Sequence, residues 1–165
     1  MGAIGEVFQD LIGLCAWKVE NGWASFLTME FGEPRLEIRE PRPDIHDASA
    51  RVKRNYVRRR VTIVGRWHFW LQHCTWVITT SGGSLSSADE DAETIKARLE
   101  ELDGQILISV SESPDNLSCK FEFDLGGALQ TAALIDSNAD NDQWTLHHAD
   151  GRVFAYGRDG TYQAS

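Results

Sequence analysis

Histidine and cysteine side chains, the residue types that bind transition metals, gather in the middle of the chain. His68, His73 and Cys74 are close in sequence, and His147 and His148 could approach them from another strand. Imidazole and thiolate are the ligands that zinc prefers. In a strand, however, His68 and Cys74 share one face while His73 points to the other, and the chain has neither a CxxC nor an HExxH pattern. We expect no metal site here and interpret these imidazoles as packed or solvent-facing.

The same region allows a second interpretation, a pocket for a small ligand. His68, Trp70 and His73 bring polar and aromatic side chains to one segment, a common composition for binding pockets. This alternative function, a small-ligand-binding or enzymatic β domain, requires that these side chains line one cavity.

An acidic loop at 136–142 begins like a calcium-binding loop, with oxygen-bearing side chains at its first, third and fifth positions. The match then ends. Asn141 replaces the glycine of the sixth position, and His147 stands where a bidentate glutamate is needed. We expect a solvated turn, and the sequence implies no cofactor.

Motifs for nucleophilic or phosphate chemistry are absent from the sequence. There is no G-x-S-x-G elbow, and the glycine-containing segment 81–84 lacks the lysine of a phosphate-binding loop. Cys74 and Cys119 fall on apolar strand faces, where a thiol is usually inert packing. These observations favour a protein that is not an enzyme.

The charge of the chain is unevenly distributed. The whole chain carries −9, but residues 51–60 contain six basic residues and no acidic one, which leaves −15 on the rest. An acidic body disfavours nucleic-acid binding because phosphate repels it. We prefer to interpret the basic run as a loop that folds over the acidic surface of its own domain. The alternative is a docking loop for a protein partner, with Arg54, Tyr56, Arg58 and Arg59 as contact residues.

The stretch 59–80 is the expected structural centre, because it holds three of the six tryptophans and favours extended structure. It contains two apolar triplets of opposite parity: Trp67, Phe69 and Leu71, then Cys74, Trp76 and Ile78. A β-bulge at Gln72–His73 would put both triplets on one face, and we prefer this long bent strand to a strand buried on both faces. Either way the strand should be central, since an apolar edge strand invites aggregation.

The segments before this stretch predict a short helix and three strands. Apolar residues at helical spacing predict a helix over 3–14. Asn21-Gly22 between two extended runs predicts a tight hairpin that sets Trp17 opposite Phe26. A strand at 35–39 then extends this hairpin into a meander with one wet side, and residues 40–58 form a long loop.

The segments after it predict one helix and a run of short strands. Ser87 and Glu90 form a capping-box pattern and Gly104 suits the C-terminal cap, so we expect a helix over 88–102. The chain as a whole predicts a mainly β fold (β-rich α+β), an antiparallel sandwich or bent barrel of about 8–10 strands, with the two helices covering an open end or face.

Length and composition are those of one ordinary globular domain. At 165 residues, with 42% hydrophobic and 25% charged residues, the chain predicts a single domain over 1–165. Three cysteines fit reduced thiols better than a disulfide framework. The opening residues lack the positive leader of a signal peptide, and no apolar run is long enough for a membrane span. We expect a cytoplasmic protein without a membrane partner, either monomeric or homodimeric.

Three motifs resemble those of a family of small bacterial proteins with no assigned activity. They are W-x-V-x-x-G-x-x-S-F-L-T-x-E-F-G-E-P-R-L-x-I-R-E-P from Trp17 to Pro41, W-H-x-W from Trp67 to Trp70, and Q-W-T-L-x-x-x-D-G-R-V from Gln143 to Val153. The resemblance covers most of the chain and implies no catalytic residue. In its size, acidity and expected β structure the chain is also similar in profile to immunity proteins of bacterial toxin systems, which is an analogy of class.

We therefore expect a non-enzymatic protein-interaction domain, immunity-like in profile, that binds a protein partner. This hypothesis rests on the acidic body, the missing catalytic motifs and the arginine-rich segment 51–60. Homodimerisation through the face that bears Trp70 is a third alternative.

Overall fold

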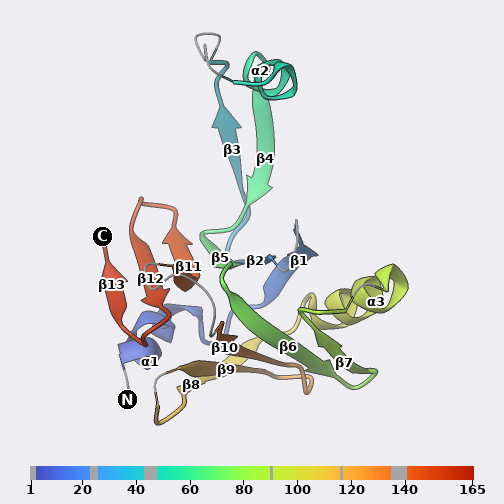
Figure 1. Ribbon diagram of the computed structural model, residues 1–165, viewed down its shortest axis with the longest axis vertical. Helices are drawn as coiled ribbons and strands as arrows, with labels where there is room; N and C mark the ends of the chain where they lie inside the picture. Colours follow the sequence, from blue (N-terminus) through green and yellow to red (C-terminus); the bar gives the residue numbers. More distant parts are fainter. Residues whose placement is uncertain (1–2, 23–25, 43–47, 90, 116, 135–140) are drawn as a thin grey trace.

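The computed structural model describes residues 3–22, 26–42, 48–89, 91–115, 117–134 and 141–165. The described residues form two antiparallel sheets that pack face to face and a separate two-stranded arm that extends away from them (Figure 1). Neither of the two large sheets closes into a barrel. The predicted mainly β, antiparallel fold is confirmed, and it takes the form of a sandwich.

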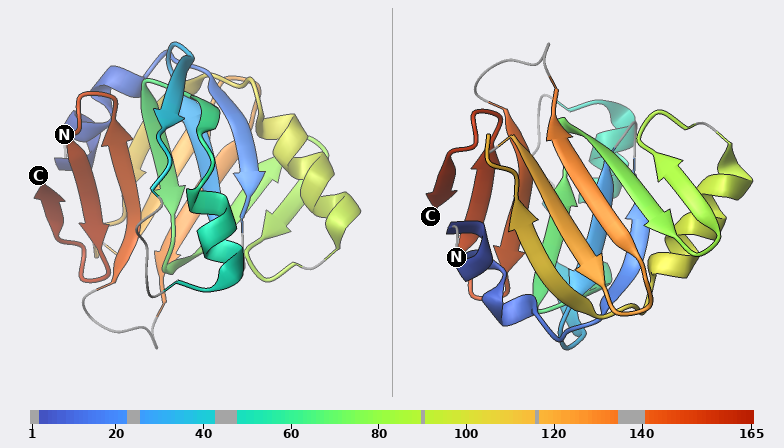
Figure 2. Two further views of the ribbon diagram at one scale, coloured as in Figure 1. Left: turned by 90° about the horizontal axis from the view of Figure 1, so that it is seen from above. Right: turned by 90° about the horizontal axis from the view of Figure 1, so that it is seen from below.

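Both large sheets are open, and their neighbouring strands pair antiparallel. One sheet has six strands, in the order β1 (Ala16–Asn21), β2 (Leu27–Phe31), β5 (Trp67–Leu71), β11 (Asp142–His148), β12 (Val153–Gly157) and β13 (Tyr162–Ala164). The other has five, in the order β7 (Gly83–Ser86), β6 (Cys74–Thr80), β10 (Ala128–Ala133), β9 (Ser118–Phe123) and β8 (Leu107–Glu112). Figure 2 shows the second sheet in front when the molecule is seen from below.

An aromatic cluster joins the two sheets. Phe69 on β5 and Phe121 on β9 have ring centroids 5.1 Å apart, so the inner faces of both sheets touch here. Phe8, from the N-terminal segment, packs edge-on against both of these rings and against Trp144 of β11. All four side chains are almost fully buried. This packing holds the sandwich closed, because large aromatic side chains contribute most of the buried apolar surface of a core.

Two helical segments cover opposite sides of the sandwich (Figure 2). The N-terminal segment forms α1 (Ala3–Val7), which contacts β8, and a 3-10 turn η1 (Gln9–Leu11). The predicted helix over 3–14 is therefore interrupted, although its apolar residues Ile4, Phe8 and Leu11 are buried as their spacing predicts. On the other side α3 (Ala92–Leu102) contacts β1, β6 and β7.

The start of α3 differs from the prediction. The helix begins at Ala92 with Asp91 as its N-cap, whose side chain accepts a hydrogen bond from the Thr94 N–H at 2.9 Å. Ser87, the predicted cap, instead continues the pairing of β7 with β6, because its Oγ accepts from the Trp76 N–H. Its predicted partner at position 90 lies outside the described residues. The predicted C-terminal end is confirmed, with Gly104 at a φ of +88° just beyond the helix.

The stretch expected to be one bent strand is divided between the two sheets. β5 lies between β2 and β11, while β6 lies between β7 and β10, so both parts are central strands as predicted. The chain crosses from one sheet to the other at Gln72–His73, and a crossing of this kind forms a corner of a sandwich. Both apolar triplets are almost fully buried in the shared core. The preferred prediction was right about their common interior and wrong about a single strand.

The first hairpin has a different register from the predicted one. Trp17 pairs with Glu30 rather than Phe26, and Asn21 pairs with Leu27, so the connection is longer than two residues. The register shifts between Trp17 and Glu20. Ala16 and Val19 are three positions apart and would lie on opposite faces of a regular strand. The bulge lets both be buried on the inner face.

The predicted meander does not form. β2 pairs with β5, and the strand at 35–39 pairs elsewhere, with β4 (Arg60–Val64), to form the arm. The strand beside β2 must cover the core, and β5 offers three large inward side chains where β3 (Arg35–Arg39) offers two aliphatic ones. Thirteen strands are described in all, more than predicted.

The arm leaves the body at two glycines. An added Cβ at Gly65 would lie 2.6 Å from the carbonyl oxygen of Phe31, so no larger residue fits there. Gly32 has a φ of +77°, a conformation that favours glycine. The close backbone contact at Gly65 and the backbone conformation of Gly32 mark where the arm begins.

Candidate functional site

One face of the arm exposes a row of aliphatic side chains. Leu36 pairs with Ile63 across the two strands, and Ile38 pairs with Val61. Each of the four is more than half exposed, between 54% and 62%. A two-stranded hairpin alone is marginally stable in water, and contiguous exposed apolar surface marks interaction sites. The arm is therefore built like a surface that becomes covered when the protein binds something.

The arm is also basic. Residues 35–64 contain nine Lys and Arg against four Asp and Glu, a net charge of +5, which leaves −14 on the rest because the whole chain carries −9. The ion pairs of the arm's arginines within the described residues, Arg39 with Glu37 and Arg59 with Glu40, both lie inside the arm. The interpretation that the basic run folds over its own acidic body is wrong, because the arm extends away from the body (Figure 1).

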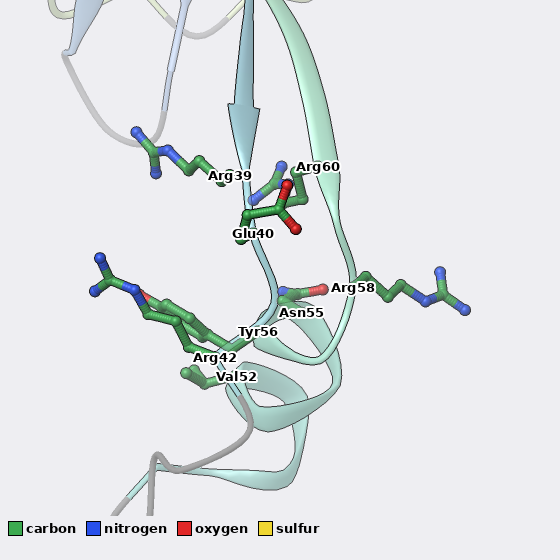
Figure 3. A pocket seen from close by; sticks show the side chains of 8 residues that line it. All are labelled: Arg39, Glu40, Arg42, Val52, Asn55, Tyr56, Arg58 and Arg60. Carbon is green, nitrogen blue, oxygen red and sulfur yellow. The ribbon is translucent and has the colours of Figure 1, made fainter.

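The tip of the arm carries a short helix, α2 (Ala50–Tyr56), in the segment expected to be a loop. The Arg42 N–H donates to the Tyr56 carbonyl at 2.7 Å and ties the end of β3 to the helix. A shallow groove of about 150 Å³ lies between them. Figure 3 shows Arg42, Tyr56 and Val52 gathered on one side of this groove, while the Arg58 guanidinium extends to the opposite side.

A bidentate ion pair joins the two strands just below the tip. The Arg59 Nη2 donates to the Glu40 Oε2 at 2.8 Å, and the Arg59 Nε donates to the same carboxylate at 3.0 Å. The hydrogen bonds from this guanidinium hold the pKa of Glu40 below its usual range. Arg59 thus serves the arm's own geometry.

The four predicted partner-binding residues all lie at the tip. Tyr56 and Arg58 line the tip groove. Arg54 is exposed on α2, whereas Arg59 is occupied by Glu40. Tyr56, at 44% exposed, is the aromatic side chain among them that a partner can reach.

A second concave site lies at the base of the arm. This base pocket, about 370 Å³, is enclosed by the arm's charged face and by the outer face of the six-stranded sheet. Its lining includes Lys18, Glu30, Arg35, Arg66, His68 and Trp70. His68 and Trp70 were predicted to share a pocket, and they do. His73 does not line it, and its ring instead packs against Phe26 at 6.2 Å between centroids.

The floor of the base pocket is a row of three side chains from adjacent strands. Glu30, His68 and His147 lie in register on β2, β5 and β11. Glu30 is 3% exposed, and its Oε1 lies 2.8 Å from the His68 Nδ1 while its Oε2 accepts from the Gly65 N–H at 2.9 Å. Burial alone would raise the pKa of Glu30, but these two hydrogen bonds, together with the electrostatic effect of His68 and Lys18, hold the pKa below its usual value.

Sequence reasoning missed Glu30, Lys18 and Arg35. The outward parity of Glu30 in its strand could be read from the alternation of LTMEF. Its burial could not, because the cover comes from the arm and from β5, which are distant in sequence. The same holds for Lys18, whose Nζ donates to the Ile63 carbonyl at the arm's base.

Other candidate chemistries find little support in the described residues. Cys74 and Cys119 are buried in the core, and burial raises the pKa of Cys74 to about 12 and that of Cys119 to about 11. No group of three or more His, Cys, Asp or Glu side chains in the described part of the chain is arranged to hold a metal ion. The first, third and fifth positions of the calcium-like loop lie outside the described residues.

Among the helices that the structure describes, none has the length and apolar character needed to cross a membrane. Comparison with protein-family models, with curated proteins and with solved structures found no match to this chain. The arm and the base pocket are therefore the features from which a function can be inferred.

Proposed function

We propose that this chain is a non-enzymatic protein-interaction domain that binds a different protein through its β3–β4 arm. The observation that carries the proposal is the row of Leu36, Ile38, Val61 and Ile63, each more than half exposed on one face of the arm. The partner is expected to present an apolar centre within an acidic surface, complementary to the arm's net charge of +5. The immunity-like profile stays a hypothesis on which this proposal does not depend.

Charge favours a protein over the other macromolecules that bind basic surfaces. A nucleic acid or an anionic bilayer would meet the arm and the adjacent body together, and the body carries −14. The apolar face is flat and aliphatic, without aromatic rings on which bases could stack. A flat β face with branched side chains packs well against another protein surface.

Charge also favours a different protein over a second copy. Two arms packed through their apolar rows would bring two segments with a net charge of +5 each close together, and these repel. A contact between the arm of one copy and the body of the next would be heterologous and would extend into open chains unless it were exchanged reciprocally.

The test compares two matched isoleucine substitutions. Ile63, on the apolar face of the arm, is 54% exposed, and Ile108, on β8, is 52% exposed. Tagged wild type, Ile63→Thr and Ile108→Thr are used to capture partners from the source-cell lysate, and the captured protein is then purified for calorimetry. Threonine keeps the β-branched shape, so the strands should persist.

Ile63→Thr should weaken binding of the purified partner by about tenfold or more, because burying an isoleucine contributes about 1.5–3 kcal/mol and ~1.4 kcal/mol corresponds to tenfold. Ile108→Thr should leave the affinity unchanged. A partner that binds both variants equally would contradict the proposal, as would a failure to capture any partner sensitive to Ile63→Thr. Sedimentation that shows a wild-type dimer and an Ile63→Thr monomer would make the partner a second copy instead.

A second experiment separates steering charge from contact. Arg54→Gln with Arg58→Gln should slow association and flatten its salt dependence while the melting temperature stays unchanged, because rim charges act mainly on the association rate. Lys96→Gln, an exposed lysine on α3, is the control outside the arm. Arg59 is left intact because its bond to Glu40 shapes the arm.

A further inference from the structure

The base pocket is positively charged although it lies in an acidic molecule. Four basic side chains border it: Lys18, Arg35, Arg39 and Arg66. Two carboxylates, Glu30 and Glu37, border it as well, which leaves an excess of two positive charges over these six side chains. Glu30 offsets one cation, and the charge of Lys18 is among the causes that lower its pKa. Glu37 lies 3.9 Å from the Arg39 Nε, so it offsets one arginine only.

Several of these cations keep unused hydrogen-bond donors. Arg35 makes no side-chain hydrogen bond or ion pair with any residue that the structure describes. Arg66 uses its Nε on the His148 Nε2 at 3.3 Å, which leaves its terminal nitrogens available. Lys18 donates one of its three N–H groups, to the Ile63 carbonyl at 3.1 Å. Guanidinium groups with free terminal nitrogens match the geometry of carboxylate and phosphate.

The backbone at Lys18 is arranged in an uncommon way. Lys18 has a φ of +52° and is the one non-glycine residue in the described ranges with a positive φ. It lies inside the bulge between Trp17 and Glu20. A bulge redirects a side chain, and a conformation of this kind persists where the surrounding structure demands it. Here the bulge brings the Lys18 side chain to the base of the arm and to the border of the pocket.

One wall of the pocket is aromatic. Trp70 lies in register between Thr28 and Thr145 on the outer face of the sheet. Phe26 packs edge-on against its indole, with ring centroids 5.8 Å apart, and fixes the ring's orientation. Next to it, the Nδ1 of His68 is engaged by Glu30, which leaves the Nε2 as the nitrogen that a ligand could contact.

We propose that the base pocket binds a small aromatic anion. Its carboxylate or phosphate group is held by Arg35, Lys18 and Arg66, and its ring lies against Trp70. The volume of about 370 Å³ suits a small molecule. This inference does not rest on the proposed function, because the pocket uses the charged face of the arm and the apolar row lies on the opposite face.

The probes are benzoate and phenyl phosphate, with benzamide as a neutral molecule of the same shape as benzoate. Binding to the purified full chain is followed by nuclear magnetic resonance on the Trp70 indole N–H. This resonance is assigned as the one that disappears in Trp70→Phe. At least one of the two anions should shift this resonance saturably. The affinity for benzamide should be lower by about tenfold or more, because benzamide lacks the charge that the arginines pair with.

Arg35→Gln should weaken binding of the anion by about tenfold, and Arg51→Gln, on α2 outside the base pocket, should not change it. Arg35 is exposed and has no side-chain partner among the described residues, so the variant should melt at the wild-type temperature. Three results would each overturn the inference: no saturable shift with either anion, equal binding of benzamide, or equal weakening by Arg51→Gln. Which anion binds more tightly identifies the acidic group.

Discussion

Glu30 and His68 lie opposite each other on β2 and β5, with the Glu30 Oε1 2.8 Å from the His68 Nδ1. Glu30 is almost fully buried, whereas the His68 side chain is about a third exposed at 35%. One member of the pair is therefore buried beneath the arm, and the other is accessible from the base pocket. Because the Glu30 Oε2 accepts a hydrogen bond from the Gly65 N–H, the same carboxylate also fixes the backbone where the arm joins the body.

The first prediction concerns Glu30. Glu30→Gln should lower the free energy of unfolding at pH 7 by about 1–3 kcal/mol, because it removes charge-assisted hydrogen bonds from a buried group. The folded-state pKa of Glu30 is lowered from 4.5, so its contribution is present above 4.5 and is lost as pH falls through the folded-state pKa. The difference between wild type and variant should therefore shrink in acid, as measured by urea unfolding across pH.

Glu20→Gln is the matched control, because Glu20 is exposed on the neighbouring strand β1. It should leave the stability within the error of the method at every pH. A Glu30→Gln variant whose deficit stayed constant down to strongly acidic pH would show that the loss comes from shape and not from charge.

The second prediction concerns the ion pair between Arg59 and Glu40. Both side chains are well exposed, so Arg59→Ala should hardly change global stability. It should instead raise hydrogen exchange of backbone amides at the arm's tip, because the two strand ends lose their link. Arg58→Ala removes the neighbouring arginine, which takes no part in the bond to Glu40 and whose side chain extends to the side opposite Arg42 (Figure 3), and it should leave exchange unchanged. Equal protection in both variants would count against a structural role for this pair.

The apolar pattern of residues 67–78 identified buried side chains correctly, because alternation is a local property of a strand. The transfer between sheets at Gln72–His73 could not be predicted from this stretch. It depends on which strands arrive on each side: β2 and β11 beside β5, and β7 and β10 beside β6. Sheet pairing over such separations is set by the whole chain.

The two sites were predictable to different degrees. The basic run 51–60 pointed to the arm's tip, because charge is visible in composition. The exposure of Leu36 and Ile38 could not be predicted, since an alternating strand at 35–39 predicts one buried face, and here that face meets solvent. Likewise the pairing of Glu30 with His68 requires the β2–β5 register, and the tight hairpin signal at Asn21-Gly22 led to a different register.

The third prediction concerns the thiols. Cys15 is exposed, while burial raises the pKa of Cys74 and Cys119 to about 12 and about 11. Since the thiolate is the reactive form, a disulfide reagent at about pH 8 should titrate one thiol of the native chain quickly and all three after denaturation. Cys15→Ser should abolish the fast reaction. A second fast thiol in that variant would mean that the core opens more readily than its packing indicates.

The fourth prediction concerns His147. Burial, and then the neighbouring His68, lower the pKa of His147 from 6.5. As pH falls below 6.5, the unfolded chain takes up a proton at this residue before the folded chain does, so the stability of the fold declines until the folded-state pKa is passed. His147→Gln removes this proton uptake and should flatten the fall in unfolding free energy between about pH 7 and pH 5. Thr145→Val provides the control, because it removes the hydroxyl 3.1 Å from the His147 Nε2 but keeps the titrating ring. It should lower stability at every pH and leave the slope intact, and a slope that changed in Thr145→Val but not in His147→Gln would assign the pH dependence to the hydrogen bond instead of to the imidazole.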